Sequence, residues 1–439
     1  MRLPQIARAL LLTALVAVAP AATAQGLLQL YENALITNPA LRSRAFGVDQ
    51  AKAQKDMARS RLLPQISAMG QYDWNEYTEF SVLGTEQYSG KRGAIIGRQP
   101  LFDLASFYRL RGAQTSVTQS EQERQAAEIA LGGEIIDRYL LVLQAEDDIV
   151  YLNSEKEAIE SQLKRLRFMR EKQMVKVTDL YEVEAYYQGL LTREIEVTNA
   201  RAIALERLRE TTGVPVTYVL PLVRETLPRV PGSEAQWVAD SVSGNPSLLA
   251  LESAVAASQR LIDSSKAEHI PTVALAGSQT YSDQGYDNRP APAYRVGTIG
   301  VELNIPIFEG GRVQASVREA TAKYEIAREQ YEATRREIEG KVRSAFLSAQ
   351  ASNARIGSTG EEVKALEKLV EAQQRSFEVG VTTVLDVLIA RRRLIKSRSD
   401  HAKARYDYIR DFTVLRVQSG ALNRMNIEEI DSWLARSRP

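Results

Sequence analysis

The chain has 439 residues, with 56 Lys and Arg against 55 Asp and Glu, two His and no Cys. A net charge near zero gives no basic field that would attract nucleic acid. The absence of cysteine excludes disulfides, thiolate catalysis and thiolate metal sites.

Residues 1–24 have the layout of a cleavable secretory signal. Arg2 and Arg8 precede an apolar stretch from Leu10 to Val18, and the small residues Ala22-Thr23-Ala24 follow. A membrane anchor is the alternative, but that stretch is about half of the ~20 residues that a spanning helix needs. Cleavage would leave 54 basic and 55 acidic residues, a net charge of −1, and no cysteine for lipid attachment. We therefore expect an exported, unlipidated chain, either soluble in the periplasm or a β-barrel in a membrane.

The next clear pattern is a strand after Leu63-Pro64. Apolar and polar residues alternate there, which predicts one apolar and one polar face, and the apolar positions are Ile66, Ala68, Gly70, Tyr72 and Trp74. A polar turn from Glu79 to Gly90 and a return strand from Lys91 to Leu101 complete a hairpin over residues 65–101.

A proline-free stretch from Pro100 to Pro215 follows, rich in Ala, Glu, Gln, Arg and Leu. This composition predicts long helices. Glycines weaken that prediction because they favour bends; they stand at Gly112, Gly132 and Gly133.

A second hairpin is expected over residues 271–307. Its first strand alternates less sharply, with Val273, Leu275, Gly277 and Tyr281 on one face. A turn from Asp283 to Ala293 and a return strand from Tyr294 to Ile307 follow. Aromatic residues gather near both hairpin tips, where a membrane-interface girdle and ordinary strand propensity explain them equally well; they are Tyr72, Trp74, Tyr77, Phe80, Tyr281, Tyr286 and Tyr294.

The second proline-free stretch, from Pro306 to Pro439, contains a heptad pattern. Steps of four and three residues link Val313, Val317, Ala320, Tyr324, Ala327, Tyr331, Thr334 and Ile338. A mean spacing of 3.5 residues predicts coiled-coil packing. Between Gly310-Gly311 and Gly380 the helix would have some 65 residues and a length of roughly 100 Å. An extended coiled-coil rod is the alternative that this pattern alone leaves open.

The two halves are duplicates about 207 residues apart. Matching pairs are Asn38-Pro39 with Asn245-Pro246, Pro64 with Pro271, Gly70 with Gly277, Asp179 with Asp386, and Gly213 with Gly420. We expect a first structural repeat over residues 25–213, an equatorial linker over 214–235, a second repeat over 236–423 and a C-terminal tail over 424–439. The linker and tail should pack as a belt around the middle of the helices.

Four strands per chain are too few for a closed barrel, and open strand edges are not tolerated in lipid. Two copies would give eight strands and a filled interior, whereas three would give twelve and a lumen. The fold class is thus an α+β membrane protein built from duplicated helix–hairpin–helix units.

Several motifs together resemble the TolC-like outer-membrane efflux factors from about Leu27 to Asn423. They are Asn38-Pro39, Leu63-Pro64, Val301 through Gly311, Gly380 with Thr383 through Leu388, and Ala404 through Tyr408. The resemblance implies a homotrimer with a twelve-stranded outer-membrane β-barrel, in contact with outer-membrane lipid, and a periplasmic α-helical barrel. It also implies a periplasmic membrane-fusion adaptor and an inner-membrane pump of the RND, ABC or MFS type as partners, in a tripartite efflux or type I secretion system.

Asp386 and Asp179 are the candidate gate residues. Each follows an expected helix reversal, where an acid at a helix start is the structural explanation. The resemblance implies an acidic ring at this tip, and three copies of Asp386 would favour cations and raise one another's carboxyl pKa. Five further positions belong to the candidate periplasmic gate, and they are Thr178, Thr382, Phe377, Gln374 and Gln162.

The family pattern differs here at several of these positions. Thr382 replaces a basic residue and Phe377 a tyrosine, Ile389 replaces a second acid, and Gln173 replaces a glycine. These differences argue against a salt-bridge lock, while Gln162 and Gln374 offer neutral hydrogen bonds. Arg391, Arg392 and Arg393 beside the tip are adaptor contacts or, more simply, a solvated helix face.

Enzyme activity is not expected. His269 and His401 are far apart and have no second histidine at ligand spacing, Gly310-Gly311 lacks a phosphate-binding pattern, and no nucleophile elbow is present. No cofactor is predicted. The alternative to an export duct is a periplasmic coiled-coil adaptor or scaffold whose hairpins never enter lipid.

Overall fold

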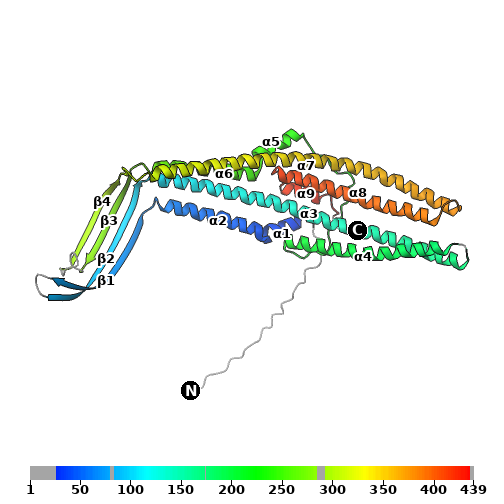
Figure 1. The fold of residues 1–439 in the computed structure, drawn as a ribbon, viewed down its shortest axis with the longest axis horizontal. Coiled ribbons are helices and arrows are strands. Elements are labelled where there is room, and N and C mark those ends of the chain that lie inside the picture. The colour runs from blue at the N-terminus through cyan, green and yellow to red at the C-terminus, as the bar shows by residue number, and fades with distance from the viewer. Residues whose placement is uncertain (1–25, 80–83, 174, 284–291, 436–439) are drawn as a thin grey trace, which may run out of the picture.

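The computed structural model describes residues 26–79, 84–173, 175–283 and 292–435. Figure 1 shows an elongated chain, with one β-sheet at one end and long helical hairpins that run away from it. The expected signal sequence, Phe80 and Tyr286 lie outside the described residues.

Each half of the chain has the same order of elements. The first half holds α1 (Leu27–Thr37), α2 (Pro39–Ser60), β1 (Gln65–Glu79), β2 (Gly84–Phe102), α3 (Leu104–Glu171) and α4 (Val177–Thr212). The second holds α5 (Glu234–Gly244), α6 (Pro246–Ala267), β3 (Thr272–Ser282), β4 (Tyr294–Asn304), α7 (Arg312–Glu378) and α8 (Val384–Gln418), and α9 (Arg424–Asp431) follows. The duplication in the sequence is therefore a duplication of structure.

The sheet has the order β1-β2-β3-β4, and every neighbouring pair is antiparallel. The two halves meet in its centre, where Gly97 of β2 lies opposite Gly277 of β3. In the described chain β1 and β4 each keep one edge without a partner strand. The sheet is thus open on both sides.

The predicted return strands had wrong boundaries. β2 begins at Gly84 and not at Lys91, because residues expected in a turn pair with β1 as far as Glu79. β4 ends at Asn304 and not at Ile307. Pro306 has no N–H for the ladder and restricts the residue before it, which ends the strand there.

α3 runs without a break for 68 residues, although its glycines predicted bends. A Cβ on Gly133 would come within 2.6 Å of Val417, and one on Gly132 within 3.2 Å of Leu422. These glycines therefore let α8 and the following loop approach α3 closely. The glycines of α3 therefore do have a structural role, but that role is to allow close packing and not to bend the helix.

α7 confirms the heptad prediction, with 67 residues between Gly311 and Val379. All eight positions of the predicted heptad are buried or half-buried, and α7 packs along α6 and α8. Gly310 and Gly311 have φ of 61° and 82°, a conformation that favours glycine, directly before the helix starts.

The main core lies at the middle of the molecule, where α1, α3, α4, α8 and α9 meet. Trp433, 1% exposed, closes it from the C-terminal side. The linker after α4 joins the same core, because the Tyr139 hydroxyl and the Leu220 backbone N–H are 2.8 Å apart. The linker also pairs with the C-terminal segment at Leu222 and Leu434. Linker and tail thus pack together at the middle of the described chain, and a belt around the helices stays a prediction.

Candidate functional site

The candidate site lies at the end of the helices farthest from the sheet, where both helical hairpins reverse direction (Figure 1). Gln173 and Gly380 follow the ends of α3 and α7 with φ of 56° and 77°. A left-handed backbone suits Gly380 but is strained for glutamine. The two reversals share a groove of about 860 Å³, lined among others by Asp179, Phe377 and Thr382.

Asp386 lies in the first turn of α8 and forms a capping box with the N-cap residue Thr383. The Thr383 hydroxyl and backbone N–H donate to Asp386 Oδ2 at 2.7 and 2.9 Å, and the Asp386 N–H donates back to the hydroxyl at 3.3 Å. These hydrogen bonds, the hydroxyl first, lower the pKa of Asp386. Within one chain its carboxylate is a helix cap, and a role in an acidic ring between copies stays a prediction.

Asp179 has the equivalent position in α4 but different partners. Lys176 stands where the second repeat has Thr383, and its side chain makes no capping hydrogen bond. Thr178 Oγ1 donates to Asp179 Oδ1 at 3.3 Å. Asp179 therefore takes less part in capping its own helix than Asp386 does.

The remaining predicted gate residues form contacts mainly within their own hairpins. Gln374 Nε2 donates to Glu378 at 3.1 Å, and Gln374 Oε1 accepts from Arg391 Nη2 at 3.2 Å. Thr382 Oγ1 donates to the Gln373 carbonyl oxygen at 3.4 Å. Gln162 is half-buried on α3, and no hydrogen bond joins it to Gln374 in the described chain. We predicted neutral hydrogen bonds for Gln162 and Gln374, but the partners of Gln374 are the charged side chains of Glu378 and Arg391.

An apolar cluster joins the two hairpins at this end. Val384 and Leu388 of α8 pack with α3 and α4 residues such as Leu166 and Val183, and Phe377 lies against the same cluster. Phe377 is thus a packing residue within the chain. The hairpins are held at the tip mainly by apolar contact, and the ionic lock that the family pattern suggests is not formed among the described residues.

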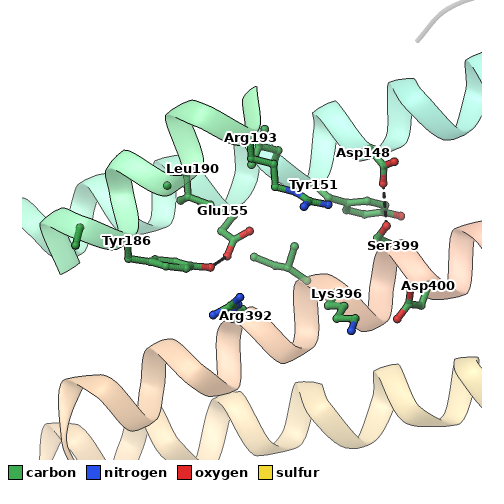
Figure 2. Close-up of a pocket in the computed structure, with 14 residues that line it drawn as sticks. Asp148, Tyr151, Glu155, Tyr186, Leu190, Arg193, Arg392, Lys396, Ser399 and Asp400 are labelled. Atoms are coloured by element: carbon green, nitrogen blue, oxygen red, sulfur yellow. Dashed lines mark hydrogen bonds between the residues drawn. The ribbon is translucent and has the colours of Figure 1, made fainter. Parts of the chain in front are cut away.

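A second groove, of about 590 Å³, lies between α3, α4 and α8 (Figure 2). Arg392 of α8 stacks on the ring of Tyr186 of α4, with its guanidinium carbon 5.6 Å from the ring centroid. The Tyr186 hydroxyl donates to Glu155 of α3. Burial first, and then Glu155, raise the pKa of this tyrosine, which stays neutral. This three-helix contact was missed by the sequence interpretation, which saw Arg391, Arg392 and Arg393 only as a charge run.

Polar pairs continue along the contact between α3 and α8. Ser399 Oγ donates to Asp148 at 2.8 Å, and the Tyr406 hydroxyl donates to Asp147 at 2.7 Å. Further along, Arg410 Nε lies 2.6 Å from Asp137. These pairs join helices from different repeats.

The histidines have structural roles or surface positions. His401 Nδ1 lies 2.9 Å from Thr359 Oγ1, and burial lowers the pKa of this histidine. His269 lies between α6 and β3. The described residues contain no group of three or more His, Cys, Asp or Glu that would hold a metal ion.

The sheet end carries a different surface. Ile66, Trp74, Ile299 and Val301 are between 65% and 79% exposed on the strands. No described helix is both long and apolar enough to cross a membrane. The aromatic residues Tyr72, Trp74, Tyr281 and Tyr294 are also exposed, at the end of the sheet away from the helices. A girdle at a membrane interface stays a prediction for them.

Comparisons with known proteins agree with this arrangement. The chain is 27% identical to the outer membrane protein TolC of Vibrio cholerae serotype O1 over 416 residues, which cover 94% of each chain. It is 26% identical to the alkaline protease secretion protein AprF of Pseudomonas aeruginosa, over 93% of this chain and 87% of that protein. Its fold matches a crystal structure of CusC with a TM-score of 0.80 and 17% identity, over 91% of this chain and 93% of that one.

The sequence profile described as "Outer membrane efflux protein" matches twice, at residues 30–214 and 237–421. These two matches cover most of the chain and fall on its two structural halves. The chain therefore belongs to the outer membrane efflux protein family.

Proposed function

We propose that three copies of this chain assemble into one continuous exit duct, with a twelve-stranded barrel in the outer membrane and a helical barrel in the periplasm. Proteins of its family are outer-membrane channels of Gram-negative bacteria, so the chain is an export duct and not an enzyme. The observation that best supports a trimer is the open four-stranded sheet with its exposed apolar side chains. In lipid every backbone N–H and C=O needs a partner, and twelve strands leave a lumen.

The long helices supply the periplasmic wall. α3 has 68 residues and α7 has 67, so each is about 100 Å long at 1.5 Å per residue. α3 follows β2 directly after Asp103, α7 follows β4 after the short connection 305–311, and both helices run without interruption to the tip. This continuity supports a single tube. It argues against the alternative, a periplasmic adaptor or scaffold.

The domain assignment follows the same duplication. We assign the two repeats to residues 25–213 and 236–423, joined by the linker 214–235 and followed by the tail 424–439. The two profile matches support this division. Three copies with two repeats each would give a wall of six similar units.

The partners at the tip would be a periplasmic adaptor and an inner-membrane pump of the RND, ABC or MFS type. Similarity to a protein named for alkaline protease secretion and to proteins named as efflux channels supports both a secretion and an efflux role. Substrates would pass from the pump to the exterior without chemical change.

Asp386 and Asp179 would line the narrow end of this duct. Their place at the two reversals supports the assignment, and the neighbouring Thr178, Thr382, Phe377, Gln374 and Gln162 would shape the closed state. Because apolar packing replaces an ionic lock within the chain, the closed state should be less sensitive to salt than one held by exposed ion pairs.

The test is single-channel recording from the purified protein in a planar bilayer. The duct predicts discrete, cation-selective currents, and Asp386→Ala should lower the cation selectivity because one carboxylate per copy is removed. Glu361→Ala, on the exposed side of α7, is the control and should leave selectivity unchanged. No current from the wild-type protein would reject the duct, whereas an unchanged selectivity in Asp386→Ala would remove Asp386 from the gate.

A further inference from the structure

The two helix reversals at the tip are equivalent in the duplicated fold, but they differ in charge. Residues 164–176 hold six Lys and Arg and one acid, a net charge of +5, and we call this segment the basic reversal. The equivalent residues 371–383 hold one Arg and two Glu, a net charge of −1. Since the second half makes the same reversal without this charge, the geometry of the turn does not require the cations.

Most of these cations have no carboxylate partner. Lys164 pairs with Glu160 at 2.9 Å, and Arg167 pairs with Glu184 at 2.8 Å. Within the described residues the other four cations form no ion pair, and all four are exposed; they are Arg165, Arg170, Lys172 and Lys176. Lys172 Nζ lies 5.8 Å from the ring centroid of Phe168, and that ring is 61% exposed. The basic reversal thus offers positive charge beside an exposed aromatic ring.

The helix dipole explains only part of this pattern. Cations are stabilised near a helix C-terminus, which suits Arg170 and Lys172 at the end of α3. Lys176, however, is the N-cap residue of α4 and makes no capping hydrogen bond. A cation is unfavourable at this end of a helix, and the equivalent Thr383 does cap α8. The chain therefore gives up local stability at Lys176, and such exceptions are typical of functional surfaces.

The place of the basic reversal favours a protein partner in the periplasm. α3 separates it from the sheet by 68 residues, or about 100 Å, so lipid around the sheet does not reach it (Figure 1). The groove between the two reversals suits an acidic partner less well, because Asp179, Glu182 and Glu378 line it. An acidic partner would therefore bind the reversal itself.

We propose that the basic reversal is a docking surface for an acidic segment of the periplasmic adaptor, and that the second reversal takes no part in this recognition by charge. This inference rests on the proposed function, which places an adaptor at this end, and adds the chemistry of the contact. Carboxylates of the adaptor pair with Arg170, Lys172 and Lys176, and an apolar side chain beside them covers Phe168. Complementary charge mainly gives specificity and fast association, so this surface selects the duct's own adaptor.

A pair of synthetic helical hairpins tests the charge recognition. One carries glutamates beside its turn, and the other carries glutamines at the same positions. Binding of each to the purified full-length protein in mild detergent is measured by fluorescence anisotropy. The glutamate hairpin should bind about tenfold more tightly, as expected for a few exposed ion pairs, and its advantage should shrink as salt rises. Equal binding of the two hairpins would overturn the proposal.

Charge reversal locates the binding surface. Arg170→Glu with Lys172→Glu should abolish the advantage of the glutamate hairpin. Arg170→Gln with Lys172→Gln adds no repulsion at the end of α3 and should also lower it. The matched control is Lys368→Glu with Arg375→Glu, which changes the charge equally at exposed positions of α7 and should keep the advantage. An equal loss in this control would assign the attraction to net charge and overturn the proposal.

Carbodiimide cross-linking in intact cells identifies the partner, because this reagent joins a lysine amine to a carboxylate in contact with it. Lys172 or Lys176 should be joined to an Asp or Glu of a periplasmic protein that copurifies with the duct. Lys172→Arg with Lys176→Arg keeps the charges, so it should lose the cross-link and keep the copurification. Cross-links only within the duct would overturn the proposal.

Two further outcomes separate this surface from other possibilities. Binding of the wild-type protein to phosphatidylglycerol vesicles but not to the glutamate hairpin would assign the basic reversal to a lipid and overturn the proposal. Single-channel currents from a protein that shows no preference for the glutamate hairpin would overturn the docking surface and leave the duct standing. Absence of currents would overturn the proposed function, and this inference with it.

Discussion

At the scale of single residues, one asparagine sets the same geometry in both halves. Asn38 Nδ2 donates to the Thr211 carbonyl oxygen at 3.0 Å, and Asn245 Nδ2 donates to the Gln418 carbonyl oxygen at 2.8 Å. Each asparagine also caps the helix that it precedes. One side chain thereby joins the start of the second helix in its repeat to the end of the last long helix.

Asn245→Ala should lower the thermal unfolding midpoint of the purified protein. Loss of an N-cap costs about 0.5–2 kcal/mol, and the Gln418 carbonyl also loses its partner in a buried place, since Asn245 is 5% exposed. Asn199→Ala, at an exposed position of α4, is the control and should not lower the midpoint. An unchanged midpoint in Asn245→Ala would mean that the cap does not limit stability.

The two helix reversals differ in backbone strain, which predicts opposite effects of exchanging their residues. A left-handed conformation costs a non-glycine residue roughly 1–2 kcal/mol, and Gln173 has φ of 56° where Gly380 has 77°. Gln173→Gly should slow hydrogen exchange of the amides around the first reversal, and Gly380→Gln should speed it around the second by about fivefold or more. Faster exchange in Gln173→Gly would show that the glutamine side chain stabilises the first reversal.

At the scale of elements, the contact between α3 and α8 contains a carboxyl group that should respond to pH. Burial raises the pKa of Asp147, while the hydrogen bond from Tyr406 and the charge of Arg405 lower it, and Asp148 and Glu146 raise it again. The folded chain therefore binds this proton more readily than the unfolded chain. Its contribution to stability is largest at low pH and is lost as pH rises through the folded pKa.

Asp147→Asn should consequently raise the unfolding midpoint near neutral pH, and the gain should shrink as pH falls towards the ordinary carboxyl range. Asparagine keeps an oxygen that accepts the Tyr406 hydrogen bond. Asp137→Asn is the comparison, and it should lower the midpoint at neutral pH because it removes the ion pair with Arg410. A pH-independent difference between wild type and Asp147→Asn would reject the account.

The cation–π contact between α8 and α4 should help to hold the two hairpins together. Such contacts contribute about 0.5–1 kcal/mol at exposed sites. Arg392→Ala should therefore speed hydrogen exchange of the first turns of α8 about two- to fivefold, and Arg393→Ala should not, since Arg393 is exposed and lies beside no aromatic ring in the described chain. Equal effects of the two substitutions would assign the change to net charge.

The elements themselves were predictable where one pattern dominates. The heptad of α7 and the duplicated hairpins follow from periodicity alone, because a long regular pattern outweighs local exceptions. The start of β2 at Gly84 did not follow from the sequence. Its Gly and polar residues suit a turn as well as a strand, and only the pairing with β1 decides for a strand. The glycines of α3 could not be explained in advance because Val417 and Leu422, which need the space, lie almost 300 residues away.

At the candidate site, too, contacts between distant parts of the sequence could not be predicted. The two reversals and the cap at Asp386 could be placed from the sequence, because capping is local. The contact of Arg392 with Tyr186 and the apolar cluster around Leu166 could not, since each depends on how two hairpins pack across the repeats. Local chemistry was therefore predictable, and contacts between repeats were not.

At the scale of the whole molecule, the described chain has open sheet edges and exposed apolar side chains at one end. Its sheet is open at β1 and β4, and large apolar side chains such as Ile307 and Phe308 are 93% and 86% exposed beside that opening. Large exposed apolar surfaces mark sites of contact with lipid or protein. The open edges and the exposed side chains support the proposal that copies of the chain close a ring.

Native mass measurement of the protein extracted from outer membranes in mild detergent tests this claim most directly. The account predicts one species with three times the mass of the processed chain, which the wild-type protein forms without any cross-link. A monomer or a dimer as the main species would contradict it, because four or eight strands do not enclose a duct.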